Sequence, residues 1–79
     1  MVFYKLRNNK DGTFLTGSRH GYANFTKKGK AFNSIAHIKS SMNPKNSGGK
    51  LPSEVTYDDL EVITYQVIEI MADKFKLYL

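Results

Sequence analysis

Residues 2–17 read VFYKLRNNKDGTFLTG and decide the fold at the front of the chain. Residues 2–8 alternate in polarity and are rich in aromatic and β-branched side chains, which predicts a strand. Residues 9–12 (NKDG) end in Asp-Gly, which supplies the positive φ of a tight hairpin turn. Residues 13–17 are therefore expected to return as the second strand of an antiparallel hairpin.

The residues after this hairpin predict a third strand and a helix. Turn-forming residues interrupt the strand pattern at 17–21, and a third short strand is expected at residues 22–26. A short helix should follow, capped by Asn33 or Ser34 and ended by Asn43-Pro44. The apolar side of that helix consists of Ile35, Ile38 and Met42.

Residues 43–79 complete the predicted sheet. Residues 43–53 (NPKNSGGKLPS) indicate a flexible polar loop without core-forming residues. Residues 60–71 (LEVITYQVIEIM) are strand-like and apolar on both sides, which predicts a central strand or one covered by a partner. Residues 72–79 leave three alternatives: a continued strand, a short helix or a frayed tail. The fold class is therefore α+β, a single domain over residues 1–79 with a small antiparallel sheet (N-terminal hairpin plus C-terminal strand) packed against one short helix.

Composition narrows the class of protein. The chain has 79 residues and no cysteine. A secreted domain of this size usually needs disulfides, so the cytoplasm is the expected compartment. Neither a membrane span nor a signal peptide is expected, because no apolar run approaches the required length. A chain this small has little room for a deep catalytic cleft, and we expect a binding protein without a cofactor, not an enzyme.

Charge is distributed very unevenly along the chain. Residues 1–50 contain ten Lys or Arg and one acid, a balance of +9, whereas residues 51–79 contain two Lys and six acids, a balance of −4. This asymmetry favours a polyanionic partner on one side of the protein. Charge that serves only solubility is the alternative.

The N-terminal hairpin offers the first candidate binding surface. If Arg7 pairs with Phe14, one face carries Val2, Tyr4, Leu6 and Leu15, and the other carries Phe3, Lys5, Arg7, Phe14 and Thr16. Basic groups interleaved with aromatic rings suit a single-stranded nucleic acid, because the cations neutralise phosphates and the rings stack on bases. Alternatively, Phe3 and Phe14 pack beneath the helix while Lys5 and Arg7 extend past it.

The turn Lys27-Lys28-Gly29-Lys30 is the second candidate. Three ammonium groups flank a glycine that allows the backbone to approach an anion closely. A solvated turn is the alternative interpretation. Arg19, His20 and Lys39 are expected to lie on the same side. The complete set of expected nucleic-acid-binding residues is Lys5, Arg7, Lys10, Phe14, Arg19, Lys27, Lys28, Lys30 and Lys39.

Neither the histidines nor the acids indicate catalysis. His20 and His37 have no nearby acid in sequence to orient them, so each is expected to be a surface residue or an auxiliary phosphate contact. Two His without Cys do not make a typical zinc site. The acids Asp58, Asp59 and Glu61 form a short cluster near the start of the last predicted strand. The adjacent Asp58 and Asp59 are expected in a solvated turn, and no metal site or catalytic residue is predicted.

Four short motifs resemble small accessory and counter-defence proteins of tailed bacteriophages. Residues 6–14 (LRNNKDGTF) are similar to their R-N-K-x-x-G-x-F opening. Residues 25–32 (FTKKGKAF) resemble an aromatic-[ST]-K-x-G-K-x-aromatic signature, although this chain has phenylalanine where many of those proteins have tryptophan. Residues 34–42 resemble the short helix that follows it. Residues 59–70 (DLEVITYQVIEI) resemble their final strand, D-x-E-[IV]-[IV]-x-Y-x-V.

This resemblance implies a counter-defence protein directed against a toxin–antitoxin system. Such a protein would engage RNA, a host toxin ribonuclease, or both. Together with the basic and aromatic residues, it favours RNA over DNA as the partner. The alternative is an inhibitor that binds a host enzyme without touching nucleic acid. A homodimer built through residues 60–71 is also expected, because an exposed apolar strand invites pairing with a second chain.

Overall fold

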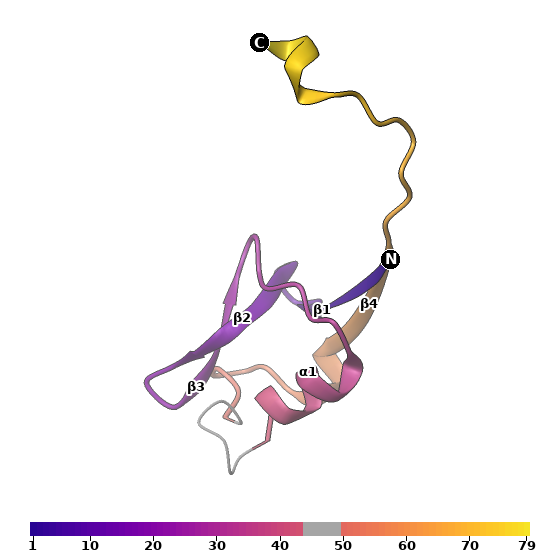
Figure 1. Cartoon of the computed structure of the whole chain (residues 1–79). Coiled ribbons are helices and arrows are strands. Elements are labelled where there is room, and N and C mark those ends of the chain that lie inside the picture. The colour runs from indigo at the N-terminus through magenta and orange to yellow at the C-terminus, as the bar shows by residue number, and fades with distance from the viewer. Residues whose placement is uncertain (44–49) are drawn as a thin grey trace.

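Four antiparallel strands form one sheet, in the order β3-β2-β1-β4. The computed structural model describes residues 1–43 and 50–79. The strands are β1 (Val2–Asn8), β2 (Thr13–Arg19), β3 (Tyr22–Thr26) and β4 (Leu60–Gln66). Among these described residues, one helix, α1 (Ile35–Ser41), lies against one side of the sheet, and two short 3₁₀ turns are η1 (Tyr57–Asp59) and η2 (Phe75–Tyr78) (Figure 1). The predicted α+β class is confirmed.

The β1–β2 hairpin has the predicted register, with Arg7 opposite Phe14. Gly12 has a φ of 74°, as the tight turn requires. The carboxylate of Asp11 accepts hydrogen bonds from the Thr13 hydroxyl at 2.6 Å and the Thr13 backbone N–H at 3.0 Å. These bonds stabilise the carboxylate and lower the pKa of Asp11 below its usual value. The β2–β3 turn is equally tight, with positive φ at His20 and Gly21, so β2 extends two residues beyond the predicted end.

β1 and β2 pair directly only next to their turn, at Arg7–Phe14 and Asn8–Thr13. Farther from the turn, residues 30–32, which follow β3 in the chain, lie between the two strands. The backbones of Tyr4 and Phe32 exchange two hydrogen bonds of 2.8 Å, and Lys30 N–H donates to the Leu15 carbonyl at 2.9 Å. One short segment thus bonds to both strands of the hairpin. The chain arrives here from one side of the sheet and continues into α1 on the other.

The core lies between the sheet and α1. Its buried residues are Leu6, Leu15, Ala23, Phe32, Ile38 and Met42. Ser34 caps the helix by accepting a hydrogen bond from the backbone N–H of His37 at 3.2 Å, which selects one of the two predicted caps. Ile35 remains 46% exposed, so the predicted apolar side of the helix is buried only at Ile38 and Met42.

Two sequence-based expectations about the second half of the chain are wrong. Leu51, in the predicted loop 43–53, packs against the core, and the backbone of Lys50 forms an isolated parallel β-bridge with that of Tyr22. Residues 44–49 of that loop lie outside the described residues. The predicted strand 60–71 ends at Gln66, and β4 occupies an edge of the sheet beside β1 instead of a central position.

Residues 67–79, here called the C-terminal arm, extend away from the sheet (Figure 1). Of the three alternatives for residues 72–79, the continued strand is wrong, since the arm contains only the 3₁₀ turn η2. Within the described residues, no helix has the length and apolar character needed to cross a membrane.

Candidate nucleic-acid interface

The side of the sheet opposite α1 carries the basic and aromatic side chains. Register places Phe3 opposite Tyr65, Lys5 opposite Ile63, and Arg7 between Glu61 and Phe14. Paired residues in an antiparallel sheet point to the same side. We call this surface the open face, consisting of Phe3, Lys5, Arg7, Phe14, Glu61, Ile63 and Tyr65. The prediction that one hairpin face is core and the other basic and aromatic is confirmed for Leu6 and Leu15, which are buried beneath α1.

Two aromatic rings lie at the end of the open face where β1 begins and β4 ends. The rings of Phe3 and Tyr65 are stacked, with centroids 4.8 Å apart and planes 5° from parallel. Both side chains are half-buried. The stack forms a rigid aromatic platform of the kind on which a nucleobase can stack.

Lys5 lies beside this platform. Its Nζ is 5.2 Å from the centroid of the Phe14 ring and 5.9 Å from that of the Tyr65 ring. It also donates a hydrogen bond of 2.8 Å to the Lys28 carbonyl. An ammonium group has three N–H donors, and the bond to Lys28 uses one of them. Because Nζ lies near the Tyr65 ring, the other two donors could bind the phosphate of a nucleotide whose base stacks on the aromatic platform.

Arg7 is already paired. Its Nη2 lies 3.3 Å from Glu61 Oε1, and its Nε donates to Asn9 Oδ1 at 2.7 Å. Asn9 in turn donates to the second Glu61 oxygen at 3.3 Å. The positive charge expected to contact a phosphate is therefore largely compensated within the protein.

The basic turn crosses the open face above Phe14. Gly29 has a φ of 66°, and a Cβ placed on it would lie 2.2 Å from the Phe14 Cβ. Its N–H donates to the Thr26 hydroxyl at 3.0 Å. The sequence predicted that the Gly29 backbone approaches an anion closely. In the structure this backbone instead approaches Phe14, which it partly covers. Lys27 and Lys28 remain exposed at the border of the face.

The other predicted residues are spread around the molecule. The Lys10 ammonium donates to the Glu54 carbonyl, and the Lys30 ammonium lies 5.3 Å from the Phe32 ring. Lys30 and His37 line one shallow hollow of about 290 Å³ beside α1.

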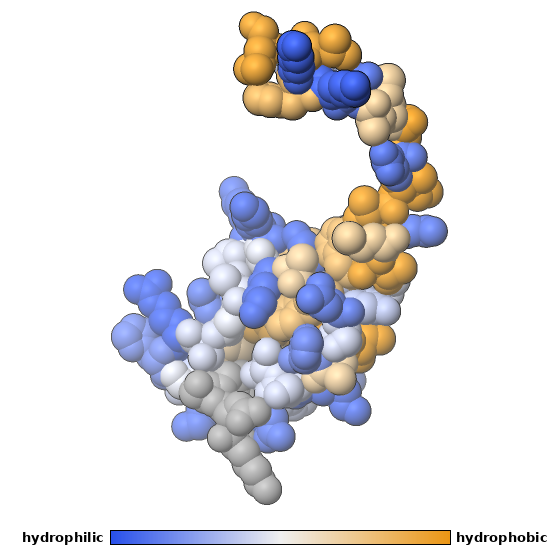
Figure 2. All heavy atoms as spheres, viewed as in Figure 1, coloured by the Kyte–Doolittle hydropathy of each residue, from blue (hydrophilic) through white to orange (hydrophobic). Residues whose placement is uncertain are grey.

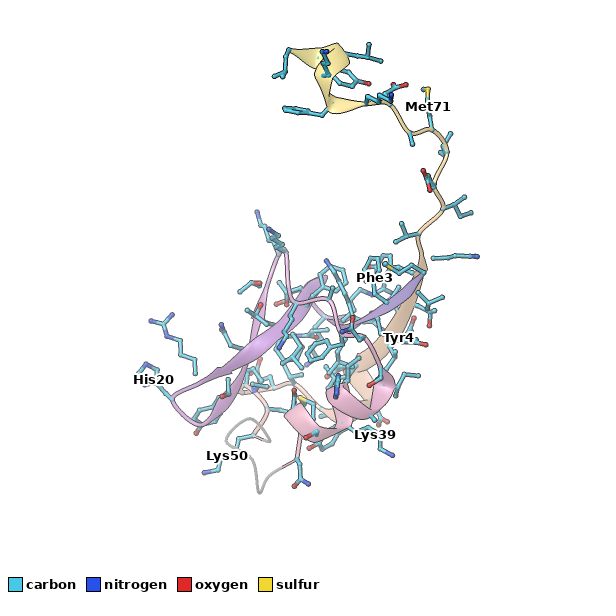
Figure 3. All side chains as sticks on the ribbon, in the orientation of Figure 1. Phe3, Tyr4, His20, Lys39, Lys50 and Met71 are labelled. Atoms are coloured by element: carbon cyan, nitrogen blue, oxygen red, sulfur yellow. The ribbon has the colours of Figure 1, made fainter. Side chains whose placement is uncertain are left out.

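Arg19 and His20 stand at the far end of the β2–β3 hairpin, and Lys39 lies on α1, on the other side of the sheet (Figure 3). The expectation that Arg19, His20 and Lys39 share a side with the basic turn is wrong. They belong to separate elements, and no described contact joins them to the turn.

Sequence reasoning missed the aromatic partner of Phe3. Alternation along a strand places Ile63 and Tyr65 on one side, but the sequence does not say which strand lies next to them. The register of β4 against β1 brings Tyr65 into the site. Among residues 1–43 and 50–79, no three His, Asp or Glu side chains are grouped closely enough to hold a metal ion.

Comparison with known proteins adds no identification: no protein-family model, curated protein or solved structure matches this chain.

Proposed function

We propose that this protein binds single-stranded RNA on its open face. The observation that carries the proposal is the stacked pair Phe3–Tyr65 with the Lys5 ammonium between Tyr65 and Phe14. A base would stack on the aromatic platform, and its phosphate would meet the ammonium group. Sheets with exposed rings are a recurrent solution for single strands, whose bases are free to stack.

Charge supports the same ligand. The net charge is +5, and the exposed Lys27 and Lys28 border the open face. A strand running from the aromatic platform towards the basic turn would pass these two ammonium groups. Each phosphate that they neutralise releases counterions, so affinity should fall with salt.

The biological role that we propose follows from the motif resemblance. A small accessory protein of a tailed bacteriophage, acting in the cytoplasm of the host, would sequester RNA or inhibit a host RNA-targeting defence enzyme such as a toxin ribonuclease. No catalytic step is part of this proposal.

A second candidate is a protein-binding inhibitor that makes no contact with nucleic acid. It is favoured by the partial cover over the open face, because Phe14 lies beneath Gly29 and Lys5 is bonded to Lys28. Both contacts reduce the area available to a base. An acidic protein surface could still meet Lys27 and Lys28.

Anisotropy titrations with a fluorescent single-stranded RNA test the proposal. Tyr65→Leu keeps an apolar side chain but removes the ring, and should weaken binding about 5- to 150-fold, the equivalent of about 1–3 kcal/mol. Tyr57→Leu is the matched control, since Tyr57 is exposed beside α1 and away from the open face. Equal affinity of the Tyr65 variant and wild type would exclude base stacking on this platform.

The salt dependence supplies a second, independent readout. Replacing Lys27 and Lys28 together by Ala should reduce the slope of log K against log salt by about 1.4, or roughly 0.7 for each phosphate contact. Lys39→Ala removes the same kind of charge from the opposite side and should leave the slope unchanged. Wild-type protein that binds no RNA, but captures an acidic host enzyme, would favour the second candidate.

A further inference from the structure

The C-terminal arm exposes an unusual amount of apolar surface. Ile68 is 69% exposed, Ile70 94% and Phe75 73%. The remaining exposed apolar residues of the arm are Val67, Met71, Leu77, Tyr78 and Leu79. Figure 2 shows this apolar material leading away from the body of the protein. A solvated monomer rarely leaves so continuous an apolar segment uncovered, which marks it as an interaction surface.

The arm is tied to the body only at its first residue among the contacts described. Val67 N–H donates to the Met1 carbonyl at 2.7 Å, and the later contact of Tyr78, which donates to Asp73 at 2.7 Å, is local. That bond raises the pKa of Tyr78. The radius of gyration is 15.7 Å, whereas a compact domain of this length would have about 12 Å. The arm therefore lacks the packing that would fix it in a single chain.

The body has a surface of matching character beside the open edge of β4. Since β4 pairs only with β1, the outer backbone groups of β4 have no strand partner within the described residues. Next to this edge lies an apolar groove of about 340 Å³, lined by Ile38 of α1, by Met42 at the end of that helix, and by Leu60 and Val62 of β4. Tyr57 also lines the groove.

We infer that this chain forms a two-fold dimer in which the arm of each copy pairs antiparallel with β4 of the other. Residues 67–71 (VIEIM) have the composition of a strand, but no strand of residues 1–43 and 50–79 pairs with them in a single copy. Between Gln66 and Asp73 there is no Gly, Pro, Asn or Asp to form a tight turn. The arm therefore lacks a hairpin back onto its own β4, whereas it can continue straight along the edge of a second copy.

Side-chain alternation supports the same pairing. A two-fold axis at Gln66 places Ile68 opposite Thr64 and Ile70 opposite Val62 of the second copy. Val62 faces the groove, so Ile70 would extend the apolar surface under α1 of the second copy. Further along, the same register places Phe75 opposite Tyr57, which lines the groove.

Protection of the sheet edge agrees with this arrangement. Pairing removes a long edge strand that would otherwise promote aggregation. The two open faces would lie on the same side of one continuous sheet, because a two-fold axis perpendicular to the sheet preserves its sides.

Light scattering on the nuclease-treated full chain at micromolar concentration tests the association. We expect a mass of about twice the 9.0 kDa of one chain. Ile70→Lys should weaken dimerisation at least tenfold, because it would place an ammonium group over the partner's groove. A wild-type mass near 9.0 kDa, or an Ile70 variant that dimerises as tightly as wild type, would overturn the inference.

Cysteine cross-linking tests the geometry and does not depend on how the Ile70 variant folds. The chain has no cysteine, so Gln66→Cys introduces a single thiol. At the two-fold axis the two Cα atoms would be about 4.5–5.5 Å apart, within disulfide range. Mild oxidation should link the Gln66 variant into dimers, whereas His37→Cys, on the exposed side of α1, should remain largely unlinked. A dimer that does not link through position 66 would overturn the pairing. The outcome does not depend on RNA binding, since a monomer that binds RNA would refute the dimer alone.

Discussion

The two sides of the sheet differ in burial and charge, although the same strands form both. On the covered side, Leu6 and Leu15 are at most 6% exposed and belong to one apolar cluster with Phe32 and Ile38. On the open face, Lys5 and Arg7 alternate with them along the chain but remain half-exposed among aromatic rings and one carboxylate. Burial on one side provides the stability that allows charge to be concentrated on the other.

The crossing at Gly29 connects the two sides. The chain passes over Phe14 on the open face, then inserts residues 30–32 between β1 and β2, and Phe32 reaches the core. The basic turn is thus held in place by the same segment that supplies a core residue. A change at this crossing should affect both sides.

Shortening a core residue should produce the largest difference between the sides. Leu15→Ala removes the most buried side chain, which is 1% exposed, and should cost about 2–5 kcal/mol of the free energy of unfolding. Ile63→Ala on the half-buried open face should cost about 1–2 kcal/mol, because less apolar area is lost from the folded state. Urea unfolding followed by circular dichroism measures both. Equal losses would mean that the open face belongs to the core.

The crossing should be the next most sensitive place. Gly29→Ala combines an unfavourable positive φ with a Cβ that would lie 2.2 Å from the Phe14 Cβ, and should cost about 2–5 kcal/mol. Gly12→Ala is the matched control, since its φ of 74° is similar but no atom lies within 4 Å of the added Cβ. It should cost only about 1–2 kcal/mol. If the two thermal unfolding midpoints fall equally, the contact with Phe14 does not restrict the turn.

Much of the fold follows from local sequence signals. Asp-Gly at residues 11–12 fixes the hairpin turn, and with it the register that separates Leu6 and Leu15 from Lys5 and Phe14. Ser34 begins the helix as its capping chemistry indicates. These features depend on neighbours within a few positions, so a single sequence contains the information.

The features that could not be predicted from the sequence depend on contacts between residues far apart in the chain. The stack of Phe3 on Tyr65 and the ion pair of Arg7 with Glu61 exist only because β4 lies beside β1. Likewise, the sequence of residues 60–71 is strand-like throughout, but β1 has partners for only the first seven. Backbone pairing, and not local propensity, ends β4 at Gln66.

The smallest expected change in stability comes from a substitution on the open face that also tests where RNA binds. Glu61→Gln removes the one acid in this surface and leaves the Arg7 guanidinium without a charged partner. The pair is exposed to solvent, so the change should cost less than about 1 kcal/mol of stability. RNA affinity should rise about two- to tenfold, because a repulsive carboxylate disappears and one more cation becomes available to phosphate. The slope of log K against log salt should steepen by roughly 0.7.

Glu54→Gln provides the control, because it removes the same charge from an exposed residue outside the open face and outside the C-terminal arm. Both variants raise the net charge equally, and a general electrostatic effect would therefore increase affinity and slope alike in the two proteins. A gain confined to the Glu61 variant would locate the RNA beside Arg7. A decrease in RNA affinity would instead mean that Glu61 holds Arg7 in the orientation that contacts RNA. The ion pair would then be part of the binding surface and would not weaken RNA binding.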